Sequence, residues 1–110
     1  MKPRISYYGQ TATPRTNARL EDYGSIKFFY SYDTVIAYED NTDGLVVTIN
    51  EWTTTTGKHL NYIDPNHDTR KDPDTFKAML EAAYIRHSIN DPNPRVINNL
   101  PVYTLHIEKD

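Results

Sequence analysis

The stretch that decides the fold lies between Ile26 and Ile49 and reads IKFFYSYDTVIAYEDNTDGLVVTI. Residues 26–32 place apolar or aromatic side chains at every second position, which is the period of a strand with one buried face. Residues 34–39 are β-branched and aromatic, and residues 45–50 repeat the alternation. Residues 40–44 between them are Asp, Asn, Thr, Asp and Gly, which favour tight turns. We therefore expect one strand followed by a β-hairpin.

Two helices are expected after the hairpin. Residues 53–56 are four threonines that can cap a helix start, and Pro65 ends the helix that follows. Residues 72–73 combine an N-cap Asp with a Pro at the first helical position. Apolar residues at spacings of three and four continue from there to about Ser88, which predicts the second helix. A last strand is expected where Tyr, Leu and Ile alternate at positions 103–107.

These elements follow the order β-β-β-α-α-β, and the fold class they predict is α+β. We expect a small antiparallel sheet of about four strands with both helices packed on one face. A chain of 110 residues is one domain's worth of sequence, and its lack of cysteine excludes disulfides and thiol catalysis. Its apolar windows are shorter than the roughly 20 residues of a membrane span, and no secretory signal opens it. The sequence therefore predicts a soluble protein without a membrane partner.

Basic and acidic residues are unevenly distributed along the chain. Residues 1–20 contain no acid and carry a net charge of +4. The bases of this segment are Lys2, Arg4, Arg15 and Arg19. Residues 21–110 carry eight bases against fifteen acids, a net charge of −7. The sequence predicts a basic N-terminal arm over residues 1–22, followed by a single α+β domain over residues 23–110.

The arm is a candidate for nucleic-acid binding. Its bases Arg4, Arg15 and Arg19 can lie along phosphates, and Tyr7 and Tyr8 between them can stack on nucleobases. The alternative is a loose or edge-docked terminus, which is common at chain ends. The acidic balance of the rest of the chain argues against a broad nucleic-acid-binding face.

Three segments resemble a family of small bacteriophage proteins whose domain has no assigned function. They are residues 16–19 (TNAR), 31–37 (SYDTVIA) and 54–61 (TTTGKHLN). The shared features are a Ser-Tyr-x-Thr segment and a Thr-Thr-x-Lys/Arg-His segment ahead of a helix, within roughly residues 7–64. The resemblance implies a phage or prophage origin, and therefore the host cytoplasm as the location. It implies no activity and no catalytic residue.

The threonine-rich helix start is a second candidate binding site. Its residues are Trp52, Thr54, Thr55, Lys58 and His59. Hydroxyls that cap free amides, next to a lysine and a histidine in the first turn, can bind an anion. The structural alternative is that one threonine caps the helix, Trp52 packs with Leu60, and His59 hydrogen-bonds across to the hairpin.

Enzymatic motifs are missing from the sequence. The four histidines do not repeat a zinc-site spacing, and no nucleophile motif is present, so we expect no catalytic residue, no metal site and no cofactor. His67, Asp68 and Arg70 could form a site, but their polar loop favours solvated side chains.

Nine tyrosines and an acidic balance favour a recognition protein. The first hypothesis is a non-enzymatic binding protein that acts on a host or defence-system protein, for example a CRISPR nuclease inhibitor that resembles the charge of DNA. The second is a nucleic-acid-binding accessory protein that uses the basic arm. The third is a sponge for a nucleotide signal at Lys58 and His59. A homodimer is possible in each case, because a small domain can bury more apolar surface by pairing.

Overall fold

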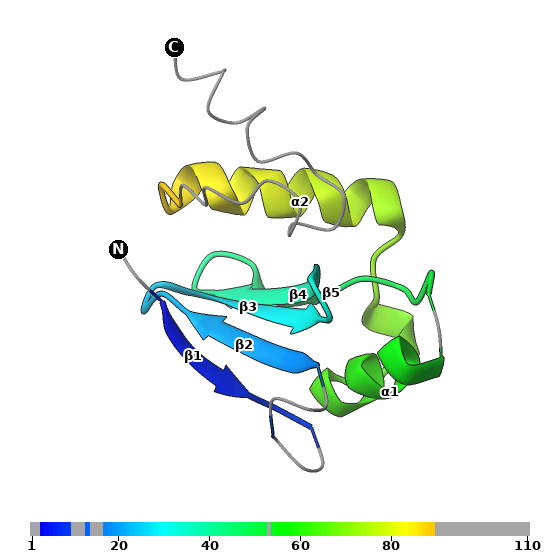
Figure 1. Ribbon diagram of the computed structural model, residues 1–110. Helices are drawn as coiled ribbons and strands as arrows, with labels where there is room; N and C mark the ends of the chain where they lie inside the picture. Colours follow the sequence, from blue (N-terminus) through cyan, green and yellow to red (C-terminus); the bar gives the residue numbers. More distant parts are fainter. Residues whose placement is uncertain (1–2, 10–12, 14–16, 53, 90–110) are drawn as a thin grey trace.

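The computed structural model describes residues 3–9, 13, 17–52 and 54–89. One antiparallel sheet contains five strands in sequence order. They are β1 (Arg4–Tyr7), β2 (Ala18–Asp22), β3 (Ile26–Ser31), β4 (Thr34–Asp40) and β5 (Gly44–Val47). Two α-helices, α1 (Thr54–Ile63) and α2 (Pro73–Arg86), follow the sheet, with the short 3-10 helix η2 (His67–Thr69) between them (Figure 1).

The α+β class, the first predicted strand, the hairpin and both helices are confirmed. The turn between β4 and β5 forms because Asp40 Oδ1 accepts hydrogen bonds from the backbone N–H groups of Thr42 and Asp43. The start of α2 is capped by the Asp72 side chain, which accepts from the N–H of Thr75 at 2.8 Å. The strand expected at residues 103–107 lies outside the described residues.

The strand number and order differ from the prediction, because two strands precede the expected first one. β1 and β2 come from the segment predicted to be a basic arm, and β2 pairs with both β1 and β3. The order of the described elements is therefore β-β-β-β-β-α-α, and the sheet has five strands. β1 is an edge strand with mostly exposed side chains, so it lacks the apolar alternation that reveals a half-buried strand.

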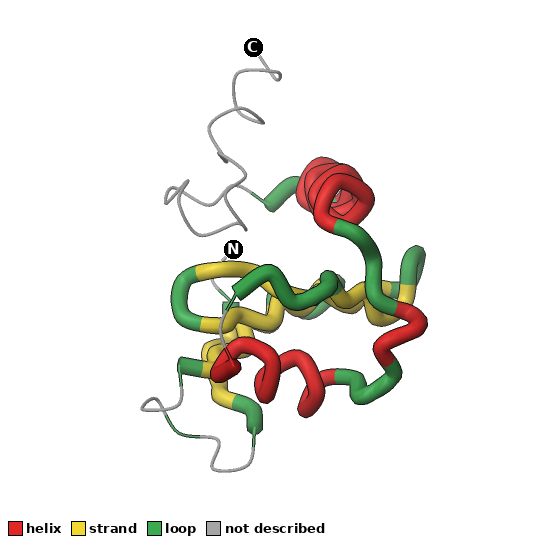
Figure 2. The backbone as a smooth tube through the Cα atoms, turned by 90° about the vertical axis from the view of Figure 1, so that its right-hand side faces the viewer, coloured by secondary structure: helices red, strands yellow, loops and turns green. Residues whose placement is uncertain are grey.

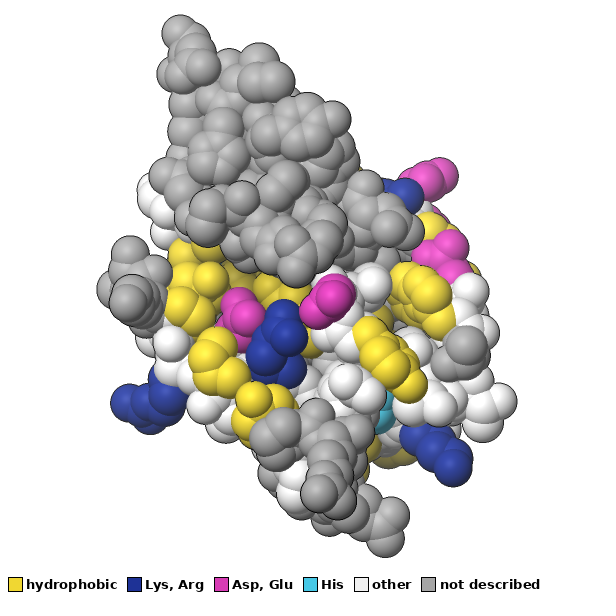
Figure 3. Space-filling view, viewed as in Figure 1, with side chains coloured by type: hydrophobic (Ala, Val, Ile, Leu, Met, Phe, Trp, Pro, Cys, Tyr) yellow, Lys and Arg dark blue, Asp and Glu magenta, His cyan; other side chains and the backbone are white. Residues whose placement is uncertain are grey.

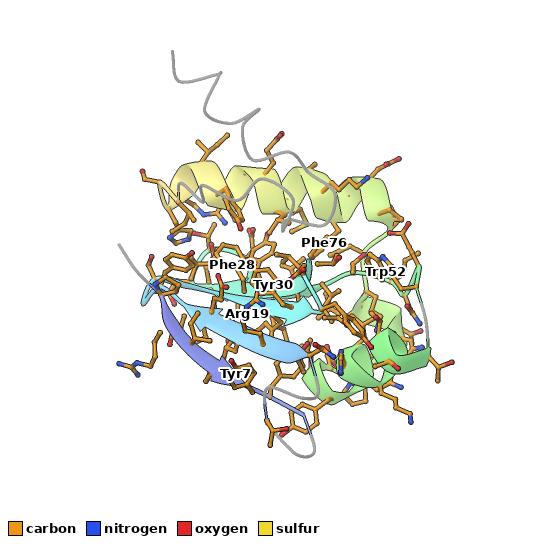
Figure 4. All side chains as sticks on the ribbon, in the orientation of Figure 1. Tyr7, Arg19, Phe28, Tyr30, Trp52 and Phe76 are labelled. Carbon is orange, nitrogen blue, oxygen red and sulfur yellow. The ribbon has the colours of Figure 1, made fainter. Side chains whose placement is uncertain are left out.

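The prediction that both helices pack on one face of the sheet is wrong. Helix α2 covers one face and α1 covers the other (Figures 1 and 2). Phe76 and Leu80 of α2 pack in a core cluster with Phe28 and other residues of β3 to β5, and the labelled Phe28 and Phe76 lie between sheet and helix in Figure 4. Leu60 of α1 packs in a separate cluster with residues of β4 and β5. The molecule therefore has three layers, with two small cores.

A β-bulge explains how β4 serves both cores. Phe29 pairs with Ala37, whereas Tyr30 pairs with Val35, so Ile36 is an extra residue on β4. Ile36 and Ala37 belong to the cluster under α1, and Val35 belongs to the cluster under α2. Every one of these three β4 residues is fully buried. Their continuous apolar run is typical of a strand buried on both faces.

None of the described helices is long and apolar enough to cross a membrane.

Candidate functional site

Residues 31 and 54–61, which are distant in the sequence, meet in a buried polar cluster. Ser31 lies at the end of β3. Its Oγ is 2.9 Å from the Thr56 hydroxyl oxygen and 2.8 Å from Nδ1 of His59. Thr56 and His59 are on the first two turns of α1, and all three side chains are buried. The cluster joins the start of α1 to the β3–β4 turn. We call it the Ser31 cluster.

His59 therefore faces the sheet, as in the structural alternative, and does not project from the helix with Lys58. Its ring also packs against Tyr8 and Tyr32, with ring centroids 6.0 and 6.4 Å away. Tyr8 itself is buried, and its hydroxyl donates to the Tyr30 carbonyl oxygen at 2.7 Å. Through these contacts, His59 and Tyr8 have a structural role beneath the surface that contains Tyr32.

Replacing Ser31 by Ala is expected to lower the free energy of unfolding by about 1–3 kcal/mol, because the buried Thr56 hydroxyl loses its hydrogen-bond partner in this cluster. Urea unfolding measures the change. Ser6→Ala on the exposed edge strand is the control and should change the value by less than about 0.5 kcal/mol. Equal stabilities for the two variants would contradict a structural role for the Ser31 cluster.

Tyr32 stands on the surface beside this cluster, between two hollows. One hollow has a volume of about 180 Å³ and is lined by Ser31, Tyr32, Thr34, Ile36, Trp52 and Thr56. The other has a volume of about 210 Å³ and is lined by Tyr7, Asn17, Arg19, Tyr32 and Asp33. We call Tyr7, Arg19, Tyr32 and Trp52 the aromatic face. Figure 3 shows hydrophobic side chains gathered around basic and acidic ones on the side of the molecule where Figure 4 labels Tyr7, Arg19 and Trp52.

Arg19 is held in place within the aromatic face. Its Nε donates to Glu21 Oε2 at 2.9 Å, and its guanidinium carbon lies 4.1 Å from the centre of the Tyr30 ring. Asp33 Oδ1 lies 3.9 Å from Arg19 Nη1. These contacts place the Arg19 guanidinium between two carboxylates and the face of the Tyr30 ring. Arg4 is exposed on β1, and Arg15 lies outside the described residues.

A larger groove lies on the other flank of α1. Its volume is about 520 Å³, and its polar lining consists of Asn50, Thr54, Lys58, Asn61, His67 and Arg70. Thr54 and Thr55 are exposed in the first turn of α1, but only Thr54 lines the groove. We call this the cationic groove. His67 and Arg70, for which the sequence favours solvated positions in a polar loop, line this groove together with Lys58.

Asn61 explains how the loop residues reach the groove. Its Oδ1 accepts a hydrogen bond from Arg70 Nη2 at 2.8 Å and lies 3.0 Å from His67 Nε2. Asn61 is one helical turn beyond Lys58 on the same flank of α1, so one amide places two loop side chains beside the lysine. In the sequence, the only indication of this groove is a spacing: Thr54, Lys58 and Asn61 follow one another at four and three residues, as on one side of a helix.

A third polar group joins the end of α2 to the β4–β5 turn. Asp40 Oδ2 lies 2.6 Å from Arg86 Nη2 and 2.8 Å from His87 Nε2, and His87 Nδ1 lies 3.0 Å from Ser25 Oγ. The order Ser, His, Asp resembles a hydrolase triad. However, Arg86 neutralises the carboxylate that would have to stabilise a charged imidazole in that chemistry. We assign this group a structural role, and call it the Asp40 network.

Comparison with known proteins adds the family and nothing about activity. The profile of a family of unknown function (DUF8033) matches residues 3–79, which include the aromatic face, the Ser31 cluster and the cationic groove. No curated protein and no solved structure matches the chain. In the described part of the chain, no group of three or more acidic or histidine side chains could hold a metal ion.

Proposed function

We propose, for a chain that belongs to this family of unknown function, that the protein is a non-enzymatic binding protein whose contact surface is the aromatic face. The observation that carries the proposal is Tyr32. Its side chain is large and apolar, its exposed fraction is 49%, and it stands between two hollows. Tyrosine, tryptophan and arginine are the residues that most often dominate the binding energy of protein interfaces.

The backbone of Tyr32 supports this interpretation. Its φ angle is +57°, in the left-handed region that costs a bulky residue of order 1–3 kcal/mol. Glycine or asparagine would occupy this turn with less strain. A tyrosine held there places an aromatic ring outward at a cost in stability, and such strain is more frequent at functional positions than elsewhere.

The two hollows define the chemistry of the partner. Each is smaller than a typical small-molecule site, which has a volume of about 300–1,000 Å³. Each nevertheless has room for one protruding side chain. We infer a protein partner that places an apolar side chain in the hollow beside Trp52 and a polar side chain in the hollow beside Arg19. The net charge of −7 over residues 21–110 favours a partner with a basic surface around that contact. A host or defence-system protein, such as a nuclease with a basic channel, fits this description.

The substitution Tyr32→Gly tests the proposal, since glycine accepts the positive φ and removes the whole exposed side chain. We expect a free energy of unfolding within about 1 kcal/mol of the wild type, because relief of strain offsets the flexibility of glycine. Tagged wild-type protein in a bacterial lysate, treated with nuclease and washed with high salt, is expected to retain one protein in stoichiometric amount. The Tyr32→Gly variant should lose it.

Ile85→Ala is the matched control, because Ile85 is 52% exposed on α2, away from the aromatic face. This variant should retain the same partner as the wild type. The proposal fails if Tyr32→Gly retains the partner to the same extent as the control, or if the wild type retains no protein after both treatments. Retention that depends on nucleic acid would instead favour the basic segment that contains Arg4.

A further inference from the structure

The cationic groove has the size of a ligand site. It lies between α1, the loop that contains η2, and residues 49–50. Its volume of about 520 Å³ is in the range of small-molecule sites, about 300–1,000 Å³. Ile49, with an exposed fraction of 38%, adds an apolar side chain to the otherwise polar lining. The groove and the aromatic face share no lining residue. Each can therefore be altered without touching the other.

Two positive charges in the groove have no carboxylate partner among the described residues. Lys58 and Arg70 form no ion pair there, whereas Arg19 and Arg86 each pair with two carboxylates. None of the lining residues is acidic. A partly buried arginine is normally paired, because its desolvation is otherwise uncompensated. The groove therefore carries a net positive charge that an anion can neutralise.

Arg70 is also fixed in position by neutral groups. Its Nη2 donates to Asn61 Oδ1 at 2.8 Å and to the Asp64 carbonyl oxygen at 3.2 Å. Its Nε is buried and has no hydrogen-bond partner within the described part of the chain. The two hydrogen bonds from Nη2 tie the side chain to α1 and to the residue that follows it. The guanidinium is thus oriented before any ligand arrives.

We propose that the cationic groove binds the phosphate group of a small molecule of nucleotide size. Phosphate oxygens suit this set of groups: the Lys58 ammonium, the positive charge of the Arg70 guanidinium and the first turn of α1 at Thr54, where backbone N–H groups favour an anion. The amides of Asn50 and Asn61 and the side chain of Ile49 remain for the rest of the ligand. This site is independent of the proposed protein-binding surface.

Titration of the full-length protein by calorimetry tests the site, with AMP, GMP, inorganic phosphate and adenosine as probes. We expect both nucleotides to bind, phosphate to bind more weakly, and adenosine not to bind. Affinity should fall as salt is raised, because the contact is ionic. Binding of adenosine with the affinity of AMP would show that the phosphate is not recognised, and no binding of any probe would overturn the proposal.

Lys58→Gln and Arg70→Gln remove one charge each and keep most of the side-chain length. Each is expected to weaken nucleotide binding about 10-fold to 100-fold, the usual range for one charge-assisted hydrogen bond. Lys77→Gln on α2 changes the net charge equally on the opposite side of the sheet and should leave the affinity within about twofold. Equal effects of all three substitutions would reduce the contact to general electrostatics and refute the site.

Two further comparisons separate this proposal from the other hypotheses. The Tyr32→Gly variant should keep the nucleotide affinity of the wild type, since Tyr32 does not line the groove. A ten-nucleotide single strand should bind no more tightly than a mononucleotide. If the strand binds much more tightly, and the same two substitutions abolish its binding, the small-ligand assignment is wrong and the groove is part of a nucleic-acid surface.

Discussion

Replacing Asp40 by Ala is expected to lower the free energy of unfolding by about 3 kcal/mol. The Asp40 side chain is fully buried and is the central acceptor of the Asp40 network. Oδ1 accepts two backbone N–H groups of the β4–β5 turn, and Oδ2 accepts from Arg86 and His87. Without the carboxylate, the two backbone N–H groups and His87 Nε2 lose this acceptor, and Arg86 keeps only its contact with Asp43. The partial exposure of Arg86, 31% of its side chain, keeps the loss at the lower end of the range for buried ion pairs.

Asp43→Asn is the matched control, because Asp43 also pairs with Arg86 but is 22% exposed and does not hold the turn. Its effect should be about 1 kcal/mol or less. Urea unfolding at pH 6 measures both variants. If Asp40→Ala costs no more than Asp43→Asn, the Asp40 network does not hold α2 against the sheet.

The stability that Asp40 contributes should also depend on pH. Burial raises the pKa of this carboxyl, but hydrogen bonds from the Asp43 backbone and from Arg86 and His87 outweigh burial and lower the pKa from 3.8 to about 2. A folded-state pKa below the unfolded value adds stability above about pH 4, and this stability is lost as the pH falls through 2. The difference between wild type and Asp40→Ala should therefore shrink by about 2 kcal/mol between pH 6 and pH 2. A constant difference would contradict this assignment.

Leu60→Ala and Leu80→Ala are each expected to cost about 2–5 kcal/mol, because both side chains are fully buried and each leaves a cavity. Leu60 anchors α1 on one face of the sheet, and Leu80 anchors α2 on the other. Ile85→Ala, at an exposed position of α2, should stay within about 0.5 kcal/mol of the wild type. Chemical denaturation measures all three. A loss of less than 1 kcal/mol at Leu60 would mean that α1 is not docked in solution.

The three-layer arrangement also predicts that the two cores act independently. Because two Leu→Ala losses together approach the total stability of a domain of this size, the coupling is better measured with Leu60→Val and Leu80→Val. Their effects should add within about 0.5 kcal/mol, since the two leucines lie in separate clusters on opposite faces of the sheet. The pair Phe76→Leu and Leu80→Val within one cluster should deviate from additivity by more.

Local signals in the sequence were sufficient to predict the elements that have a hydrophobic period or a capping side chain of their own. The turn at residues 40–44 and the Asp-Pro start of α2 were predicted because their side chains bind backbone groups within three residues. β1 and β2 lack such signals. In β2, Arg19 is stabilised by Tyr30 on the neighbouring strand and by Glu21 two positions along the chain. Where a charged residue is stabilised by a neighbouring strand, its own strand does not show an alternation of apolar and polar residues.

The face on which each helix packs, and the groove, depend on tertiary contacts. The buried run at residues 35–38 did carry a signal, since a strand with no polar position must be covered on both faces. The cationic groove carried almost none: His67 and Arg70 were separated from Lys58 by a proline and a polar loop. The Asn61 amide, which contacts both, and the Asp64 carbonyl oxygen hold them beside the helix. Hydrogen bonds that fold a loop back onto the preceding helix cannot be inferred from spacing.

The sheet pairs every strand with its neighbour in sequence, and this has a kinetic consequence. Three of its four connections are only two or three residues long, at residues 23–25, 32–33 and 41–43. Closing such short loops costs little chain entropy, so β2 to β5 can assemble as consecutive hairpins before either helix docks. For a protein whose core is a sheet, contacts this local favour fast folding and leave unpaired strand edges exposed only briefly during synthesis.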